Sequence, residues 1–366
     1  MMRIGIIGLP NVGKSTLFNA LTAAGAPADN YPFCTVEPNV GVVPVPDQRL
    51  ERLAAVVHPP QVIPAVIEFV DIAGLVQGAS KGEGLGNQFL GHIRNVDAIA
   101  HVVRCFEHPD VTHVMGTIDP VRDHDIVMTE LALADLAAAE RRLDRVKKIA
   151  RSGDKDAQAE EETLVRIVGE LDAGRAPHAA ITSDHDALLA REIGLLTALP
   201  VIYAANISEE DLGRPEIPEV EALAGAVRRL AETAEVLVFS AEFEAELADL
   251  EEAERAEFLT SVGLEQSGLE RFVAACYRLL GLETFFTFNE KEARAWTIPA
   301  GATAYDAAGK IHTDFQRGFI RADTIHVEDF IAAGSYKVAR EKGLIRSEGR
   351  EHLVQDGDVL LFRFNV

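Results

Sequence analysis

Short apolar runs, rich in β-branched residues, recur along the first two thirds of the chain. They occupy residues 3–7, 66–70, 98–103, 201–205 and 236–239. Runs that are apolar at nearly every position are typical of parallel strands that are buried on both faces. A helical pattern over residues 15–21 follows the first run, so we predict a doubly wound α/β sheet. Ligands bind such sheets at the carboxyl ends of the strands.

A different pattern begins near residue 129 and continues to about residue 172. The segment is charged and rich in alanine, and five apolar side chains are spaced to form one helical stripe: Leu133, Leu136, Leu143, Val146 and Ile149. Polar residues 151–158 provide a turn. We therefore predict an antiparallel helical hairpin, within an insertion over about 129–197, that projects to contact another molecule. Two helices packed on the sheet remain the alternative, because two heptads do not establish a coiled coil.

After residue 280 the pattern changes to short strands separated by polar turns. We predict strands at 285–288, 297–299, 318–320, 327–330 and 359–364, around one helix at 304–312. These elements form a small α+β module over residues 281–364. Residues 1–280 then make up the α/β domain with its helical insertion.

The composition is that of a folded soluble protein, with 48% hydrophobic and 25% charged residues in 366. The net charge of −23 disfavours nonspecific attraction to nucleic acid or to an anionic membrane, so an RNA partner must meet a local patch. The three cysteines, Cys34, Cys105 and Cys276, are too few and too scattered for a disulfide framework. No apolar stretch approaches about 18 residues. We therefore expect a cytoplasmic protein without a membrane segment.

One motif carries the chemistry. Residues 8–15 read GLPNVGKS, which matches GxxxxGK[ST] directly after a predicted strand and before a predicted helix. Gly8 and Gly13 let backbone N–H groups point at phosphates, and the following helix adds the positive end of its dipole. Lys14 reaches the β and γ phosphates, and Ser15 offers its hydroxyl to Mg²⁺. The motif predicts a nucleoside triphosphate site in which Lys14 is catalytic.

Two further residues complete the predicted metal site. Thr35 lies in a loop after the first helix, where its hydroxyl can join Ser15 on Mg²⁺ when triphosphate is bound. Asp71 ends a predicted strand and opens the sequence DIAG, so its carboxylate can hold Mg²⁺ through water. Six glycines follow between residues 74 and 91, a density that suits a loop ordered by nucleotide and released after hydrolysis.

The water-positioning residue is replaced. Many GTPases have a glutamine directly after the DxxG sequence, but this chain has Leu75, which cannot orient water. Another group must therefore do so. The polar candidates nearby in sequence are Gln77, His92 and His113, and spacing alone does not distinguish them.

The base-recognition motif is also altered. Guanine-specific P-loop proteins usually end a late strand with Asn-Lys-x-Asp, whose aspartate accepts two hydrogen bonds from guanine. Here the strand ends in NISE at residues 206–209, so Asn206 is kept, Ile207 replaces the lysine, and Glu209 is one methylene longer than aspartate. We expect weakened guanine selectivity, with adenine meeting backbone groups around Ile207. Ser240, after the next strand, fits a base-supporting loop.

These motifs together closely resemble one family, the YchF or Obg-like ATPases. The resemblance rests on GLPNVGKSTLFNAL at 8–21, FCTVEPN at 33–39, DIAGLVQGASKGEGLGNQFL at 71–90, NISEED at 206–211 and the C-terminal module. It spans essentially the whole chain. Its most specific element is the NxxE base motif combined with the long glycine-rich segment, because many proteins share the P-loop.

The resemblance implies a Ras-like G domain with an inserted helical coiled coil and a C-terminal TGS domain of the β-grasp type. It implies nucleotide contacts from Ile207 and from a run of P-loop residues: Asn11, Val12, Gly13, Lys14, Ser15 and Thr16. It also implies that His113, after the RCFE sequence at 104–107, takes the place of the missing glutamine. Asn11 is associated in related GTPases with a monovalent-cation site, which implies dependence on K⁺.

The predicted function is that of an Mg²⁺-dependent ATPase that prefers ATP to GTP. By the resemblance it is a slow switch that binds the ribosome, with the large subunit expected, and modulates translation or a stress response. Two alternatives stay open. One is a GTP-binding switch, and the other is a binding module in which ATP sets the shape presented to a partner and hydrolysis is incidental.

Overall fold

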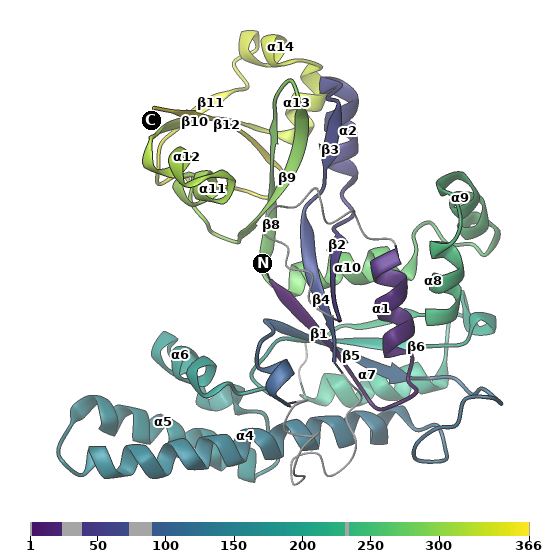
Figure 1. The fold of residues 1–366 in the computed structure, drawn as a ribbon, viewed down its shortest axis with the longest axis vertical. Helices are drawn as coiled ribbons and strands as arrows, with labels where there is room; N and C mark the ends of the chain where they lie inside the picture. The colour runs from purple at the N-terminus through teal and green to yellow at the C-terminus, as the bar shows by residue number, and fades with distance from the viewer. Residues whose placement is uncertain (1, 24–38, 73–89, 231–233, 366) are drawn as a thin grey trace.

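The computed structural model describes residues 2–23, 39–72, 90–230 and 234–365, which form two mixed β-sheets with their helices (Figure 1). The first sheet has the strand order β2-β4-β1-β5-β6-β7. Its strands are β1 (Arg3–Ile7), β2 (Val40–Pro44), β4 (Val66–Asp71), β5 (Ala98–Arg104), β6 (Val201–Asn206) and β7 (Val236–Phe239). All neighbours are parallel except β2, which runs antiparallel to β4. The predicted doubly wound α/β sheet is therefore confirmed, with β2 as an unpredicted edge strand.

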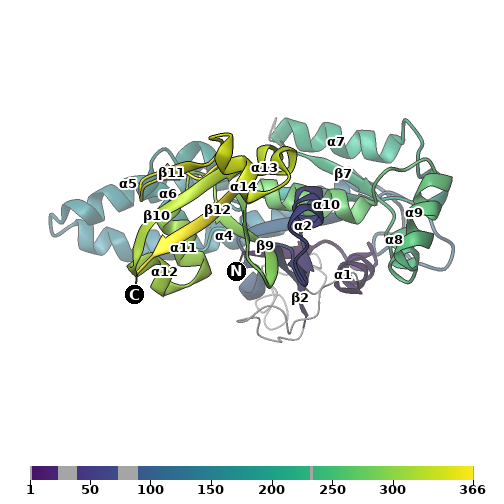
Figure 2. The same ribbon diagram turned by 90° about the horizontal axis from the view of Figure 1, so that it is seen from above.

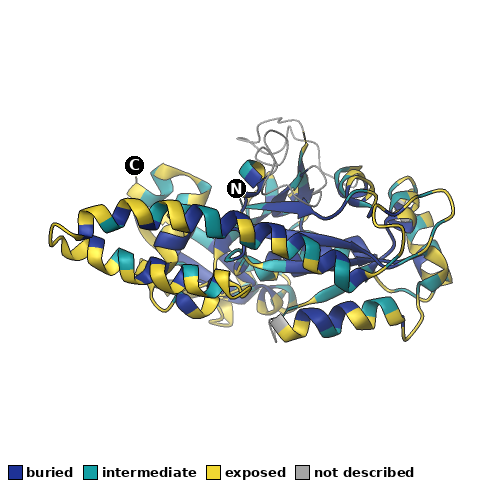
Figure 3. Cartoon of the chain, turned by 90° about the horizontal axis from the view of Figure 1, so that it is seen from below, coloured by how far each residue is buried: buried dark blue, intermediate teal, exposed yellow. Residues whose placement is uncertain are grey.

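Helices cover both faces of this sheet. Helices α1 (Lys14–Ala23) and α10 (Gly268–Leu279) lie on one side, and α4 (Pro120–Ala150) and α7 (Pro218–Leu230) lie on the other (Figure 1 and Figure 3). Helix α8 (Ala241–Ala248) packs beside α1 and is followed by α9 (Glu252–Ser261). In the core, the ring of Phe272 on α10 lies 5.8 Å from Phe69 and 6.4 Å from Phe239, so α10 joins β4 to β7.

The predicted helical hairpin is present. Helix α4 begins on β5, and its second half leaves the sheet with the antiparallel α5 (Lys155–Asp172) as a projecting arm (Figure 1). Asp119 and Asp154 cap the two helices by accepting hydrogen bonds from the N–H groups of Arg122 and Ala157. A short 3₁₀ turn (Pro177–Ala180) and α6 (Asp184–Ile193) lead back to β6. The buried carboxylate of Asp135 fixes this return, because it accepts three hydrogen bonds from Leu196 and Thr197.

The predicted apolar stripe on α4 is partly wrong. Leu133 and Ile149 are 38% and 54% exposed, although Leu143 and Val146 are buried as predicted. In the buried stripe, alanines alternate with larger apolar residues, and its members are Leu131, Ala134, Ala138, Ala139, Leu143, Val146 and Ala150. Alanine allows neighbouring helices to approach closely, so alanines can form much of a buried helix face. The prediction considered only the larger apolar side chains and therefore placed the buried face of α4 incorrectly.

The second sheet has the order β11-β10-β12-β8-β9-β3. Its strands are β3 (Gln61–Ile63), β8 (Leu282–Phe288), β9 (Glu292–Pro299), β10 (Phe319–His326), β11 (Arg346–Glu348) and β12 (Asp358–Phe364). Helices α11 (Ala304–Ile311) and α12 (Thr313–Arg317) pack on one face and share an apolar cluster with Phe285 and Leu360. Helices α13 (Val327–Ala333) and α14 (Tyr336–Glu341) follow β10 (Figure 2).

One early segment of the chain joins the two sheets. Strand β3 pairs in parallel with β9, and helix α2 (Gln48–Val57) packs against α13. Arg52 forms a bidentate ion pair with Glu328, and Arg49 contacts Asp356. Residues 48–63 therefore pack against the C-terminal module, although they precede it by more than 200 positions.

The predicted strand at 327–330 is wrong, because these residues open helix α13. His326 caps the helix by accepting from the N–H of Glu328, and Gly334 ends it with φ of 74°. Val327 and Phe330 are buried three positions apart, which is helical spacing. The strand predicted at 318–320 is in fact the beginning of the longer β10. In the described part of the chain, we find no helix long and apolar enough to cross a membrane.

Candidate functional site

The loop between β1 and α1 adopts a conformation that its sequence makes possible. Three residues have positive φ angles, Gly8 at 151°, Asn11 at 61° and Gly13 at 99°. A Cβ atom at Gly8 would lie 2.4 Å from the carbonyl oxygen of Val102, and one at Gly13 would lie 2.3 Å from Nδ2 of Asn206. Both glycines are therefore required by backbone angle and by space. Val12 anchors the loop, because its side chain is only 1% exposed.

Lys14 is the first residue of α1, and its side chain folds back over the loop. Its Nζ donates a hydrogen bond to the carbonyl oxygen of Leu9 at 2.7 Å. Burial lowers the pKa of Lys14 to about 8, and the charge of Asp71 partly opposes that shift. The ammonium group thus has a weakly satisfied positive charge beside the helix N-terminus, which suits it to bind phosphate.

Ser15 and Asp71 come together although they are 56 positions apart. The Ser15 hydroxyl donates to Oδ2 of Asp71 at 3.1 Å. Parallel pairing of β1 with β4 causes this proximity, because it sets Ile6 beside Asp71 at the carboxyl ends of both strands. A hydroxyl and a carboxylate are oxygen ligands of the type that Mg²⁺ prefers, so the pair fits that metal. Thr16 is exposed on the same first turn, and Thr35 lies outside the described residues.

Asn206, at the end of β6, links the P-loop to the loop after β7. Its Nδ2 donates to the carbonyl oxygen of Val12 at 3.0 Å, and its Oδ1 accepts from the N–H of Ala241 at 2.9 Å. Ser240 is buried as the cap of α8. The carboxyl ends of β1, β6 and β7 thus converge, as the sequence predicted for the phosphate and base loops.

The rest of the base motif divides between core and surface. Ile207 is 2% exposed, and its side chain packs in an apolar cluster with Val103 and Tyr203. Its N–H donates to Phe239, so its carbonyl group is the backbone group left for a base. Glu209 is exposed at the start of a 3₁₀ turn (Glu209–Asp211).

The segment that carries His113 lies beside the P-loop. Asn11 donates from Nδ2 to the carbonyl oxygen of Thr112 at 3.2 Å, and Arg104 donates to the carbonyl oxygen of Asn11 at 3.4 Å. His113 itself is buried, and its Nε2 lies 2.7 Å from Oδ2 of Asp123. Its Nδ1 accepts from the N–H of Met115 at 3.1 Å. The imidazole is therefore close to the site but fully engaged by protein partners.

Two other residues were candidates for positioning water, His92 and Gln77. His92 is exposed just after the described residues resume at position 90, and Gln77 lies outside them, as does Leu75. Sequence reasoning missed Asp123 and the contact of Arg104 with the P-loop. No spacing rule marks either, because both act through contacts that only the fold creates.

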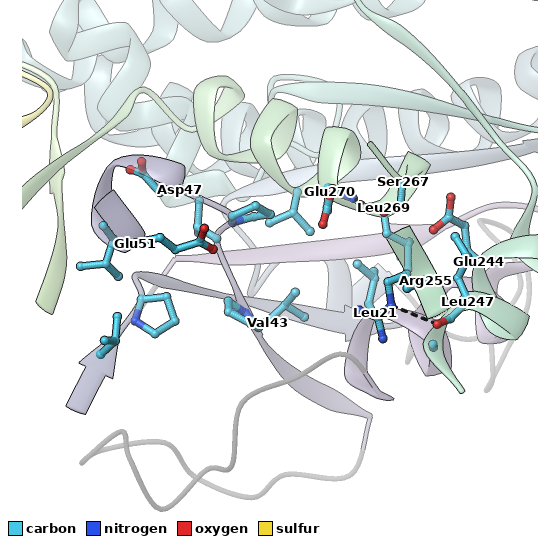
Figure 4. Close-up of a pocket in the computed structure, with 18 residues that line it drawn as sticks. Leu21, Val43, Asp47, Glu51, Glu244, Leu247, Arg255, Ser267, Leu269 and Glu270 are labelled. Atoms are coloured by element: carbon cyan, nitrogen blue, oxygen red, sulfur yellow. Dashed lines mark hydrogen bonds between the residues drawn. The ribbon is translucent and has the colours of Figure 1, made fainter. Parts of the chain in front are cut away.

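A separate hollow of about 370 Å³ lies at the other end of α1 (Figure 4). Leu21, Val43 and Leu247 contribute to its apolar lining. The buried carboxylate of Glu244 also lines it and accepts from the N–H of Gly268 at 2.6 Å, which caps α10. The pocket is lined by residues of α1, β2, α2, β3, α8, α9 and α10, and these do not include the P-loop.

Comparisons with known proteins agree with this geometry. A family model described as a 50S ribosome-binding GTPase matches residues 3–138, and one for the C-terminal domain of YchF GTPases, described as a protein of unknown function, matches residues 282–365. The chain is 51% identical to the ribosome-binding ATPase YchF of Escherichia coli O157:H7, over 100% of this chain and 99% of that protein. It is 50% identical to the protein of the same name in Bacillus subtilis (strain 168), over 99% of each.

A solved structure extends the agreement to the fold. The Schizosaccharomyces pombe YchF GTPase superimposes with a TM-score of 0.89 at 34% identity, over 99% of this chain and 97% of that one. The predicted fold class is thereby confirmed. Full-length identity, matching architecture and an intact P-loop with Lys14, Ser15 and Asp71 in place together show that the chain belongs to the YchF family of P-loop nucleotide hydrolases.

Proposed function

We propose that this protein is an Mg²⁺-dependent ATPase that acts as a slow nucleotide-dependent switch on the ribosome, in the cytoplasm. The observation that carries the proposal is the meeting of Lys14, Ser15 and Asp71 at the end of β1. Relatives of about 50% identity that bear the name ribosome-binding ATPase support the choice of reaction and partner. The match to a model described as a 50S ribosome-binding GTPase supports the large subunit as the docking site.

In this proposal the P-loop holds the triphosphate through its backbone N–H groups. Lys14 leaves the Leu9 carbonyl to neutralise the β and γ phosphates. Ser15, Asp71 and Thr35 hold Mg²⁺, which, when bound, offsets the charge that develops on the transferred phosphoryl group. Asn11 adds a K⁺ site beside the same phosphates.

The base site favours ATP over GTP. A buried Ile207 cannot supply the lysine of a guanine reader, and Glu209 places its carboxylate one methylene too far for a paired contact. A polar group left unpaired in a base pocket weakens binding by about 1 to 3 kcal/mol. This site therefore does not bind guanine in preference to adenine. Asn206 and Ser240 hold the two base loops in position.

His113 positions the attacking water after it leaves Asp123. The described conformation keeps the imidazole engaged, which supports slow hydrolysis by the protein alone. Within the proposal, residues 1–280 form the G domain and residues 281–364 the TGS domain. The S. pombe relative is named a GTPase, which makes a GTP switch the second candidate function.

Turnover measurements test the proposal. Wild type should hydrolyse ATP in Mg²⁺, while Lys14→Ala should lose hydrolysis and bind triphosphate much more weakly. Thermal unfolding of both proteins shows whether the fold survives the loss of the Lys14 hydrogen bond to the carbonyl oxygen of Leu9. Full activity in a folded Lys14→Ala variant would refute the P-loop chemistry. Sedimentation with 50S and 30S subunits tests the partner.

A further inference from the structure

A buried arginine lies at the carboxyl end of β5, where this strand reaches the P-loop. Arg104 is the last residue of β5, and it is 1% exposed. Its guanidinium carbon lies 4.5 Å from the ring centre of Phe106, within the range of a cation–π contact. Arginine stays charged in proteins, and a buried charge destabilises the fold unless other groups compensate it. The groups that Arg104 contacts therefore identify its role.

The side chain of Arg104 donates to carbonyl oxygens. Its Nε donates to the carbonyl oxygen of Phe106 at 3.1 Å, and its Nη1 donates to that of Asn11 at 3.4 Å, which is a long hydrogen bond. Burial lowers the pKa of Arg104, and the negative charge of Asp123 opposes this shift. Arg104 forms no ion pair with any residue that the structure describes, and Asp123 is already engaged by His113. The guanidinium group is therefore committed to two backbone carbonyl groups.

These two carbonyl groups belong to the two segments that the proposed mechanism brings together. Asn11 is the P-loop residue other than glycine that has a positive φ angle, at 61°. This angle lies in the left-handed region, which residues with a side chain rarely adopt. Phe106 begins the segment that leads from β5 to His113. Arg104 thus joins the P-loop to the start of that segment through one rigid, planar group.

A second contact joins the same two segments nearer to His113. Nδ2 of Asn11 donates to the carbonyl oxygen of Thr112 at 3.2 Å, directly before His113. Asn11 is therefore held on both sides, because its carbonyl oxygen accepts from Arg104 while its side chain donates to Thr112. A left-handed conformation of a residue other than glycine persists only where surrounding contacts hold it. The contacts that run from Arg104 to the residue before His113 therefore pass through Asn11.

Resting on the proposed function, we propose that Arg104 is a positioning residue for ATP hydrolysis, which holds the His113 segment against the P-loop through the carbonyl oxygens of Asn11 and Phe106. Without Arg104 the segment is held less closely, so the water-positioning imidazole reaches the site less often. Triphosphate binding depends on Lys14 and on backbone N–H groups of the P-loop, and Arg104 donates to none of these. Arg104 therefore controls kcat rather than the affinity for ATP.

Steady-state hydrolysis and ATP titration of full-length variants test the proposal. Arg104→Met removes the donors but keeps a long unbranched side chain, and replacing a buried charge by an apolar group commonly preserves stability. Arg104→Lys keeps the charge but has all its donors on one nitrogen. The matched control is Arg255→Met, because Arg255 also donates to two backbone carbonyl oxygens, those of Leu247 and Leu250, beside the pocket that excludes the P-loop. Arg104→Met is also combined with His113→Ala, and thermal melts verify every variant.

Arg104→Met should lower kcat roughly fivefold or more and leave Kd for ATP within about twofold of wild type, and it should cause no further loss in the His113→Ala background. Arg104→Lys should also lose activity, and it carries the comparison if Arg104→Met does not fold. The control should match wild type. Unchanged kcat in a folded Arg104 variant, an equal fall in both backgrounds, or a large rise in Kd for ATP would overturn the proposal. Absence of ATP hydrolysis in the wild type would instead refute the proposed function.

Discussion

The imidazole of His113 donates a hydrogen bond from Nε2 to Oδ2 of Asp123, with 2.7 Å between the two atoms. The direction follows from the other ring nitrogen, because Nδ1 accepts from the N–H of Met115 and so carries no proton. The second oxygen of Asp123 accepts from Arg122, which holds the carboxylate in place. His113 is only 6% exposed, so the contact holds the proposed catalytic group inside the protein.

Weakening this contact should speed basal hydrolysis. In Asp123→Asn the acceptor loses its charge, and a hydrogen bond to a neutral acceptor is weaker by about 1 kcal/mol. If release of His113 limits turnover, kcat for ATP should rise roughly fivefold with KM nearly unchanged. Steady-state kinetics on variants of verified thermal stability measure this effect.

The matched control is the double variant. His113→Ala alone should lower kcat severalfold or more and leave ATP affinity nearly unchanged, and adding Asp123→Asn to it should have no further effect. A rise in kcat in the double variant equal to that in Asp123→Asn alone would mean that Asp123 does not act through His113.

ATP affinity should weaken at alkaline pH. In the free protein the pKa of Lys14 is about 8, lowered by burial, so the side chain loses its positive charge as pH rises through that value. Phosphate binds the charged form, so Kd for ATP should be steady below pH 8 and rise towards about tenfold per pH unit above it. Lys14→Arg, which stays charged, should lose this dependence. A wild-type Kd that is constant from pH 7.5 to 9.5 would contradict the assignment.

The base preference should respond to one methylene group. Glu209 is exposed, so Glu209→Asp tests the carboxylate position at little cost to folding, and the ratio of ATP to GTP affinity should shift towards GTP. Adding Ile207→Lys should shift it further but lower the melting temperature, because Ile207 is 2% exposed in an apolar cluster. Titration calorimetry with both nucleotides measures the ratio of ATP to GTP affinity. An unchanged ratio in both variants would show that this motif does not select the base.

Two buried histidines should make the fold sensitive to acid. The rings of His101 on β5 and His124 on α4 stack at 5.7 Å, and burial lowers the pKa of each below 6.5. Lys14 lowers the pKa of His101 further, while Asp125 raises that of His124 without reversing the shift. Both are therefore neutral in the fold but take up protons when unfolded below about pH 6.5.

Stability should fall as pH drops through 6.5, by up to about 1.4 kcal/mol per pH unit for each histidine. His101→Phe, which keeps a ring beside Tyr203 but cannot be protonated, should reduce the loss between pH 7 and 5.5. Thermal melts at the two pH values measure it. An equal loss of stability in the wild type and in His101→Phe would show that other groups cause the acid sensitivity.

Sequence patterns predicted correctly the structural features that depend on the local order of residues. The five parallel strands, the P-loop and the meeting of Ser15 with Asp71 follow from apolar runs and parallel topology. Strands β2 and β3 were missed because their pairing depends on distant partners, β4 and the C-terminal β9.

The remaining errors have the same origin. Residues 327–330 look like a strand until the cap by His326 and the turn at Gly334 define a helix. The restraint on His113 was unpredictable, because it joins a loop to the first turn of a helix by side-chain contact alone. Contacts of this kind depend on tertiary packing, which propensity does not encode.

Isothermal titration of the wild-type protein with Mg²⁺-ATP and Mg²⁺-GTP, with and without 50S subunits, measures directly which nucleotide the P-loop site binds. We expect the wild type to bind ATP more tightly than GTP in both conditions, and Lys14→Ala to lose ATP binding. Tighter binding of GTP than of ATP by the wild type would contradict it.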